Sequence, residues 1–272
     1  MPPVLPVSPA GRRYGRSAPP PLPLHRMLRR VVPNLPPAVD LRPNAGPVKN
    51  QGDEGSCTAH AGTSAVEWIF RRYLHTEPVL SPQYVYAQEL IRQGSFPEGY
   101  AADDAGSDGT TLCETLIFKG SCPEASYPYV AGRIARPTST QEAAAKHYGM
   151  GAYHGVAGSA VAQSVLGDST PWPVEVGFTV YASFESDAVA NSGVVPLPQR
   201  GERVLGGHEV LCLGYDVGRM PTIRPQNCPA AFLIQNSWGN GWGLGGFCWM
   251  PVAYFDAPDT DLKIVHSGHP WI

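Results

Sequence analysis

The chain has 272 residues, 43% of them hydrophobic, which allows a sizeable core in one large domain or in two lobes and excludes disorder throughout. The formal net charge is only −3 and the main body holds no dense cluster of lysine or arginine, so we expect no nucleic-acid partner. No window approaches the roughly 18–20 apolar residues of a membrane helix and the first thirty residues lack the apolar stretch of a secretory signal, so we expect a soluble protein, cytoplasmic or exported by a non-classical route.

Residues 1–37 form a distinct N-terminal segment that is rich in proline and arginine. They hold eleven of the 29 prolines, including the run PPPLPL at 19–24, which favours neither a regular helix nor a central strand. They also carry six arginines and no acidic residue, so the segment has a formal charge of +6 against −9 for the rest of the chain. We expect an extended arm that is attracted to the body, with a disordered terminus as the alternative.

The first half of the body is predicted to be helical. Over residues 56–74, apolar side chains recur at three- and four-residue intervals, which predicts a helix with Ser56 as its N-cap. A second helix is predicted at 81–93, which opens with the favourable pair Ser-Pro, and a third at 110–119, which is followed by a glycine that would end it.

The second half of the chain has the character of strands. Apolar and β-branched residues dominate four segments, at 174–184, 208–216, 231–238 and 247–251. Helices followed by strands indicate an α+β protein, for which we predict a helical lobe over 38–150, a β-rich lobe over 151–272, and chemistry in the cleft between them.

Cys57 is the candidate nucleophile. It follows the turn-forming segment QGDEGS and opens the first predicted helix, so its sulfur lies near the partial positive end of the helix dipole, which favours the thiolate. The other five cysteines are expected to be buried thiols or to form one bridge, and no CxxC or CxxH spacing suggests a structural zinc site. These five are Cys113, Cys122, Cys212, Cys228 and Cys248.

His208 is the candidate general base and acid among eight histidines. It stands between the diglycine Gly206–Gly207 and an apolar strand, where a polar ring can project into a cleft and glycines allow close approach. Its separation from Cys57 is near that expected between nucleophile and base in one class of cysteine enzymes. His60 is the local rival, but it lies on the nucleophile's own helix, so we interpret it as a packed, hydrogen-bonded histidine.

Asn236 is the candidate orienting residue, in the segment QNSWGNGWG. Its amide oxygen at the end of a strand can accept a hydrogen bond from the imidazole's δ nitrogen and so select the tautomer. Trp238 could shield that hydrogen bond from water, whereas Trp242 is interpreted as ordinary core packing. Gln51, in the glycine-bounded loop before Cys57, is the candidate oxyanion donor alongside the Cys57 backbone N–H.

Together these residues resemble the papain family of cysteine peptidases, in which a Gln, a Cys six residues later, a distant His and an Asn in NSWG form the catalytic set. The segments QGDEGSC, GGHEVLCLGYD and QNSWGNGWGLGGF carry the resemblance, and weaker similarity extends it over roughly 38–255. The DLR opening and the form GSCTAHA look more like the bacterial branch. The resemblance implies a two-lobe fold, with a mainly helical N-terminal lobe, an antiparallel β-barrel-like C-terminal lobe and an active site between them.

The chain departs from the family pattern at three places. Glu54 stands where many members carry a disulfide cysteine, and Thr58 stands where a tryptophan usually follows the nucleophile. Residues 1–37 are shorter and richer in proline than the helical propeptides common in the family. Because neither substitution touches a reacting atom, activity is still expected.

The resemblance also implies where a substrate binds. The substrate backbone would lie along Ser107, Asp108 and Gly109, while Gly177 and Gly206 would form a pocket for a large apolar side chain before the scissile bond. Gly207 and Trp238 complete the predicted substrate-binding set.

The implied activity is that of a thiol endopeptidase acting on peptides or proteins without a metal or organic cofactor, as a monomer. The N-terminal arm is expected to lie in or near the cleft as an inhibitory segment. A thiol acyltransferase with the same residues, or a silent binding protein on this scaffold, are the alternatives from other classes.

Overall fold

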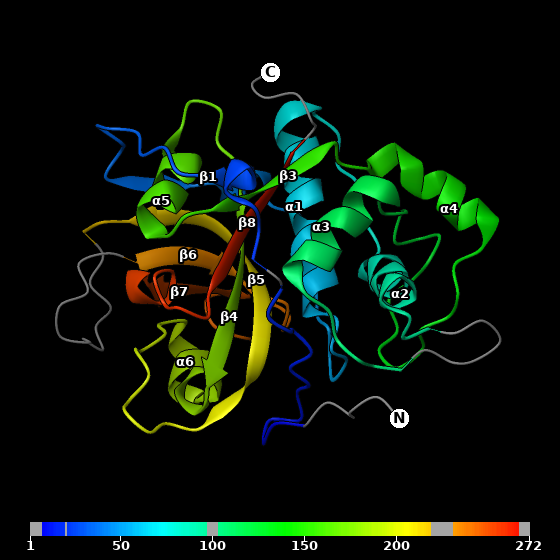
Figure 1. Cartoon of the computed structure of the whole chain (residues 1–272). Helices are drawn as coiled ribbons and strands as arrows, with labels where there is room; N and C mark the ends of the chain where they lie inside the picture. Colours follow the sequence, from blue (N-terminus) through cyan, green and yellow to red (C-terminus); the bar gives the residue numbers. More distant parts are fainter. Residues whose placement is uncertain (1–6, 20, 97–102, 219–230, 267–272) are drawn as a thin grey trace.

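The computed structural model describes residues 7–19, 21–96, 103–218 and 231–266, and it has a mixed helix and sheet fold (Figure 1). In Figure 1 the helices α1 to α4 lie on one side and the sheet with α5 and α6 on the other. The α-helices are α1 (Cys57–Tyr73), α2 (Pro82–Gln93), α3 (Gly109–Phe118), α4 (Ser139–Ala145), α5 (Ser159–Gly167) and α6 (Asp187–Ser192).

The three helices predicted from the sequence are confirmed with shifts of about one residue at their ends. Ser81 caps α2, because its hydroxyl accepts a hydrogen bond from the Tyr84 N–H at 3.0 Å. Gly120 follows α3 with φ of +68°, a left-handed conformation suited to a helix end. The capping role predicted for Ser56 is wrong in part: the residue occupies the N-cap position of α1, but its side chain makes no capping bond and contacts the Tyr129 hydroxyl at 2.8 Å instead.

Over the described residues, the sheet has eight strands and is not closed into a barrel. Its order is β1-β3-β8-β4-β5-β6-β7, with β2 also paired to β5, and every pairing is antiparallel except that of the edge strand β1 with β3. The strands are β1 (Met27–Leu28), β2 (Ala38–Asp40), β3 (Ala152–Val156), β4 (Val174–Tyr181), β5 (Val204–Asp216), β6 (Ala231–Gln235), β7 (Phe247–Pro251) and β8 (Asp261–His266).

The four predicted strands correspond to β4, β5, β6 and β7. The prediction for β4 ran three residues too far, because the chain turns into a 3-10 helix at Ala182–Glu185. The edge strand β1 and the strands β3 and β8 were not predicted. Strand β2 belongs to the predicted helical lobe by sequence, but it pairs with β5 of the predicted β-rich lobe. The boundary between the two lobes at residues 150 and 151 therefore stays a prediction.

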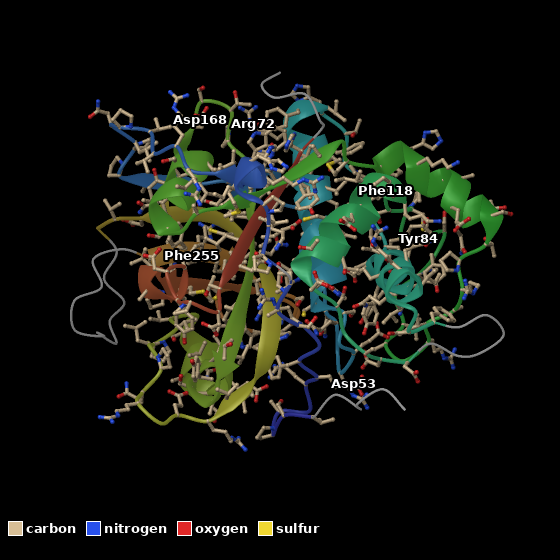
Figure 2. The ribbon with its side chains drawn as sticks, in the orientation of Figure 1. Asp53, Arg72, Tyr84, Phe118, Asp168 and Phe255 are labelled. Atoms are coloured by element: carbon tan, nitrogen blue, oxygen red, sulfur yellow. The ribbon has the colours of Figure 1, made fainter. Side chains whose placement is uncertain are left out.

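Helix α1 packs against β5 of the sheet on one side and against α2 and α3 on the other. Its fully buried Trp68 donates its indole N–H to the Leu41 carbonyl oxygen at 2.8 Å and contacts the Tyr73 ring. Figure 2 shows the two ends of helix α1: Asp53 lies just before its start, and Arg72 lies near its end. The start of α1 therefore has a fixed position relative to β5.

Four of the cysteines predicted to be buried thiols are confirmed as such: Cys113, Cys122, Cys212 and Cys248 are buried and free, whereas Cys228 lies outside the described residues. Within the described ranges, no helix combines the length and apolar character needed to cross a bilayer.

Replacing Trp68 tests the importance of the α1 contact for stability. Trp68→Ala removes a fully buried indole and leaves the Leu41 carbonyl without its donor, so we expect the free energy of unfolding to fall by about 3–5 kcal/mol in urea titrations. Trp68→Phe keeps most of the buried ring and should lose less. Equal losses for the two variants would show that packing of the indole contributes little.

Candidate active site

Gln51 lies in the loop before α1 and is held by the second lobe. Its backbone N–H donates to the Ser237 carbonyl oxygen at 2.9 Å, and the Ser237 hydroxyl donates to Gln51 Oε1 at 2.5 Å. Its amide nitrogen donates to the Glu54 carbonyl oxygen at 2.8 Å, and since an amide nitrogen has two hydrogens, one N–H is left for another acceptor. The loop before Cys57 is thereby tied to the residue after Asn236.

His208 and Asn236 are brought together by the pairing of β5 with β6. The imidazole Nε2 lies 2.8 Å from Asn236 Oδ1, which also accepts the Ser237 N–H at 2.8 Å. The sequence-based expectation of a bond to the δ nitrogen is therefore wrong. Because the bond uses Nε2, Nδ1 is left buried and without a hydrogen bond among the described residues. The imidazole thus keeps a nitrogen for a proton transfer.

Trp238 covers the histidine. Its indole stacks on the imidazole with ring centroids 5.1 Å apart and an angle of 23° between the planes. Trp242 packs edge-on against Trp238 and beside Phe184, in agreement with its interpretation as a core residue. An aromatic wall therefore separates the His208–Asn236 bond from solvent.

Cys57 begins α1 and is completely buried. Burial raises the pKa of its thiol to about 12, although the backbone N–H of Glu209, the residue after His208, opposes the rise by hydrogen bonding to the sulfur. Burial also lowers the pKa of His208 to about 4, against the stabilising hydrogen bond to Asn236. In this structure the thiol and the imidazole are consequently both neutral at neutral pH.

The N-terminal arm lies over this region, where it pairs with Ser107 on one side and Gly207 on the other. The Gly15 carbonyl oxygen accepts the Ser107 N–H at 2.9 Å, the Ser17 N–H donates to the Ser107 carbonyl oxygen at 2.8 Å, and the Arg16 N–H donates to the Gly207 carbonyl oxygen at 3.2 Å. Figure 1 shows the dark blue segment passing between β5 and the helices. The arm thus bridges both walls of the cleft by backbone pairing.

Glycines allow the arm to approach this closely. A Cβ on Gly15 would lie 2.6 Å from the Gly55 carbonyl oxygen, two residues before Cys57, and 2.7 Å from the Gly106 Cα. Gly106 has φ of +71°, and a Cβ there would overlap the Gly15 carbonyl. Two backbones therefore meet directly over the loop that leads into α1.

The side chains of the arm occupy the cleft on both sides of Gly15. The Tyr14 ring lies edge-on to His208, with centroids 5.9 Å apart, and its hydroxyl donates to Glu185 at 2.6 Å. The Arg12 guanidinium lies 4.0 Å from the Trp238 ring centroid, a cation–π contact. The Arg16 side chain is buried, with Nε 3.2 Å from Glu209 Oε2.

The predicted substrate-binding residues fall into two groups. Ser107, Gly206, Gly207 and Trp238 contact the arm directly, and a Cβ on Gly177 would lie 2.3 Å from the Arg16 side chain. Asp108 instead caps α3, with its carboxylate accepting the Thr110 and Thr111 N–H groups, and Gly109 begins that helix. The arm thus marks the same wall that the sequence predicted for a peptide.

Glu54 shows how the chain manages without the cysteine common in the family. This buried carboxylate accepts hydrogen bonds from the Gly132 N–H at 2.8 Å, the Tyr129 hydroxyl at 3.1 Å and the Gln83 amide at 3.1 Å. Burial raises its pKa, and the three donors oppose the rise. Hydrogen bonds from α2 and from the segment between α3 and α4 therefore fasten the segment before Cys57.

The rival histidine and the unusual threonine on α1 both have structural partners. His60 is buried, its Nδ1 lies 2.9 Å from the Ser56 carbonyl oxygen, and burial lowers its pKa to about 3, which confirms it as a packed, hydrogen-bonded residue. Thr58 donates its hydroxyl to the buried Glu89 on α2 at 3.0 Å.

Three acidic residues at the site, Glu185, Glu209 and Asp261, were not singled out from the sequence. Each contacts an arginine of the arm: Glu185 pairs with Arg12, and both Glu209 and Asp261 pair with Arg16. Two features of the sequence could have pointed to these acids: Glu209 directly follows the candidate base His208, and the arm and the body carry opposite net charges.

The family model described as papain family cysteine protease matches residues 35–255. The chain belongs to this family. It is 27% identical over 214 residues to an uncharacterized peptidase C1-like protein of Acanthamoeba polyphaga mimivirus, covering 75% of this chain and 64% of the relative. It is also 27% identical over 249 residues to Peptidase 1 of Dermatophagoides farinae, covering 88% of this chain and 66% of that protein. The chain therefore spans about two thirds of the length of these two relatives.

Solved structures of the family share its fold. Xylellain, a cysteine protease from Xylella fastidiosa, superposes with a TM-score of 0.76 at 27% identity, covering 93% of this chain and 96% of xylellain. The bromelain protease of Ananas comosus superposes with a TM-score of 0.60 at 23% identity, covering 85% of this chain and 99% of its own. The bromelain comparison supports the fold alone.

The buried, neutral state of Cys57 predicts slow alkylation. Because the raised thiol pKa leaves little thiolate below about pH 12, the rate of iodoacetamide labelling in the full-length protein should still be rising above pH 9. In urea, the same cysteine should titrate near its ordinary pKa of about 8.5. Mass spectrometry of the Cys57 peptide measures both rates, and a plateau below pH 8 in the native protein would contradict the neutral state.

Proposed function

We propose that the protein is a cysteine peptidase in which Cys57 is the nucleophile, His208 the general base and acid, Asn236 the residue that orients the imidazole, and Gln51 an oxyanion donor. The observation that carries the proposal is a chain of contacts between neighbouring positions: the Glu209 N–H, next to His208, bonds the Cys57 sulfur, Asn236 holds the His208 ring, and Gln51 bonds Ser237, next to Asn236. Membership of the papain family supports it.

The proposed reaction proceeds through a thioester. His208 Nδ1 takes the thiol proton, and the Cys57 thiolate attacks the peptide carbonyl carbon to form a tetrahedral oxyanion. As the oxyanion collapses, the C–N bond breaks and the histidine returns the proton to the departing amine. Water, deprotonated by His208, then attacks the thioester, which releases a carboxylic acid and restores the thiol.

Gln51 is placed to stabilise the oxyanion. Its bonds to Glu54 and Ser237 fix the orientation of the amide, so the remaining N–H needs no reorganisation during the reaction. The backbone N–H of Cys57, at the start of α1, is the second proposed donor.

Hydrolysis of fluorogenic peptides under reducing conditions tests the proposal. Cys57→Ala should abolish turnover, His208→Ala should lower kcat by roughly 10²–10⁴, and Gln51→Ala should lower it by roughly 10²–10³ with little change in KM. Trp242→Phe serves as a control for aromatic substitution near the site. Turnover that persists in Cys57→Ala, or products that carry an added acyl acceptor in place of a free carboxylate, would contradict hydrolysis by this cysteine.

We further propose that the arm inhibits the enzyme. It occupies the cleft with backbone pairing and three arginines that contact carboxylates, Arg12 with Glu185, Arg13 with Asp104 and Arg16 with Glu209. The inhibition has an electrostatic part besides the steric one, because burial and, to a smaller extent, the positive charge of Arg12 lower the pKa of His208, and burial raises that of the Cys57 thiol. Removing the arm admits water and favours the thiolate–imidazolium pair.

Gly15→Val should release the arm. The added side chain would overlap the Gly55 carbonyl and the Gly106 backbone, so we expect peptide hydrolysis to rise at least tenfold over the wild type, with faster alkylation of Cys57. Ala10→Val, at an exposed position of the same arm, is the matched control and should leave both rates unchanged. If Gly15→Val were no more active than the wild type while remaining folded, inhibition by the arm would be abandoned.

A further inference from the structure

The most distinctive pocket of the cleft is the one that holds the Arg16 side chain. Arg16 keeps only 4% of its side chain exposed, with Nε 3.2 Å from Glu209 Oε2 and NH2 3.6 Å from Asp261 Oδ2. Glu209 follows the proposed base on β5, and Asp261 begins β8. Two carboxylates from neighbouring parts of the sheet therefore converge on one guanidinium.

We propose that this pocket selects substrates, and that the enzyme prefers peptides with an arginine side chain placed where Arg16 now lies. This inference rests on the proposed peptidase function and deepens it by naming the substrate class.

Backbone geometry makes the pocket available to a substrate. The arm is extended where it pairs with Ser107 on one wall and Gly207 on the other, and those N–H and C=O groups can pair with any extended peptide. A peptide bound to the same two walls would direct one side chain into the same pocket. The occupant seen here is therefore a guide to the side chain that the pocket accommodates.

The charges of the pocket favour a cation. Lys263 contacts Asp261 and neutralises one carboxylate, and the nearby Glu175 has its pKa raised to about 8 by burial, so it is mostly protonated at neutral pH. Glu209 is then the unmatched acid: burial raises its pKa to about 7, and Arg16 is the strongest influence that opposes this rise. Without a guanidinium, Glu209 loses this influence and its pKa would rise further, so the carboxyl group would bind a proton; a guanidinium holds it as a paired carboxylate.

The shape of the pocket suits a long, flat head group. A Cβ at Gly177 would lie 2.3–2.5 Å from three guanidinium atoms, so the absence of a side chain there creates the space. Gly109 at the start of α3 similarly faces Glu209, Asp261 and Lys263, with 3.1–3.2 Å between a built Cβ and their charged atoms. Two glycines thus border the place of the guanidinium.

The arm does not exhaust the bonding capacity of the pocket. Glu209 Oε1 and Arg16 NH2 are both buried without a hydrogen bond among the described residues. A substrate arginine that shifts slightly can make the second, parallel bond and bind Glu209 in bidentate fashion. The pocket can therefore hold a substrate arginine more tightly than it holds the arm.

These observations replace the expectation of an apolar pocket. Gly177 and Gly206 do leave room for a large side chain, but the buried Glu209 would lose its guanidinium partner beside an apolar group. The two glycines in the sequence predicted a large pocket, but they could not show that Glu209 and Asp261 line it.

The first test uses full-length chain carrying Arg16→Ala, in which the pocket is vacated. Paired fluorogenic peptides differ only by arginine or norleucine at each of the three positions preceding the scissile bond. At one position, kcat/KM should be at least tenfold higher for arginine. Adding Glu209→Gln should reduce that ratio at least tenfold, while Glu114→Gln, an exposed carboxylate on α3 outside the cleft, should leave the ratio unchanged. A preference for norleucine at every position, or an arginine preference that survives Glu209→Gln, would overturn the proposal.

A second measurement decides the inference even if no peptide is cleaved, an outcome that would count against the proposed function alone. In the full-length chain, Arg16→Lys keeps a cation in the pocket and Arg16→Met places an apolar chain of similar length there. Iodoacetamide should label Cys57 at least tenfold faster in Arg16→Met than in Arg16→Lys, and Glu209→Gln with Asp261→Asn should remove the difference. Equal labelling of the two variants in the unmodified pocket would refute the preference for a cation.

Discussion

The packing of α1 against β5 is the contact on which the site depends. Cys57 begins the helix and His208 lies on the strand, and the packing of these two elements places the Glu209 N–H, next to His208 in the chain, at the Cys57 sulfur. Trp68 anchors the helix to the Leu41 carbonyl, and the bonds of Gln51 to Ser237 fasten the loop before Cys57 to the residue beside Asn236. The contacts that stabilise the fold and the bonds that position the proposed catalytic residues therefore lie next to one another.

The N-terminal arm binds beside the same interface between α1 and β5, through its bonds to Ser107 and Gly207. Its general attraction to the acidic body becomes specific because each of three arginines finds its own carboxylate, and because Gly15 and Gly106 allow backbone to lie on backbone. Charge provides attraction at a distance, whereas Gly15 and Gly106 allow the close approach of the two backbones. The combination explains why a proline-rich segment has a defined path here.

Much of this was accessible from the sequence. Apolar periodicity predicted α1, and the terminal signals Ser81-Pro82 and Gly120 predicted α2 and α3, almost to the residue, because both kinds of signal are local. The motifs around Cys57 and His208 supplied the candidate catalytic residues, whose roles stay a proposal. The short β1, and β3 and β8, were missed because their pairing partners lie far away in the chain. Two features could not be predicted from residue spacing, because they depend on the three-dimensional structure. One is the bond of Asn236 to Nε2 of His208, and the other is the position of the Glu209 carboxylate beside Gly177. Glu54 was recognised as a departure, but its three donors come from distant segments.

The pairing of β1 with β3 has a consequence for how the cleft is occupied. It anchors Met27–Leu28 to the sheet, about ten residues beyond the part of the arm that lies over Cys57. A ligand on so short a tether acts at an effective concentration that is typically millimolar and does not change when the protein is diluted. A single cut in the chain between residue 17 and β1 would convert the arm into a free peptide, whose occupancy then depends on its own dissociation constant. Covalent continuity, as much as contact area, therefore sets how often the cleft is open.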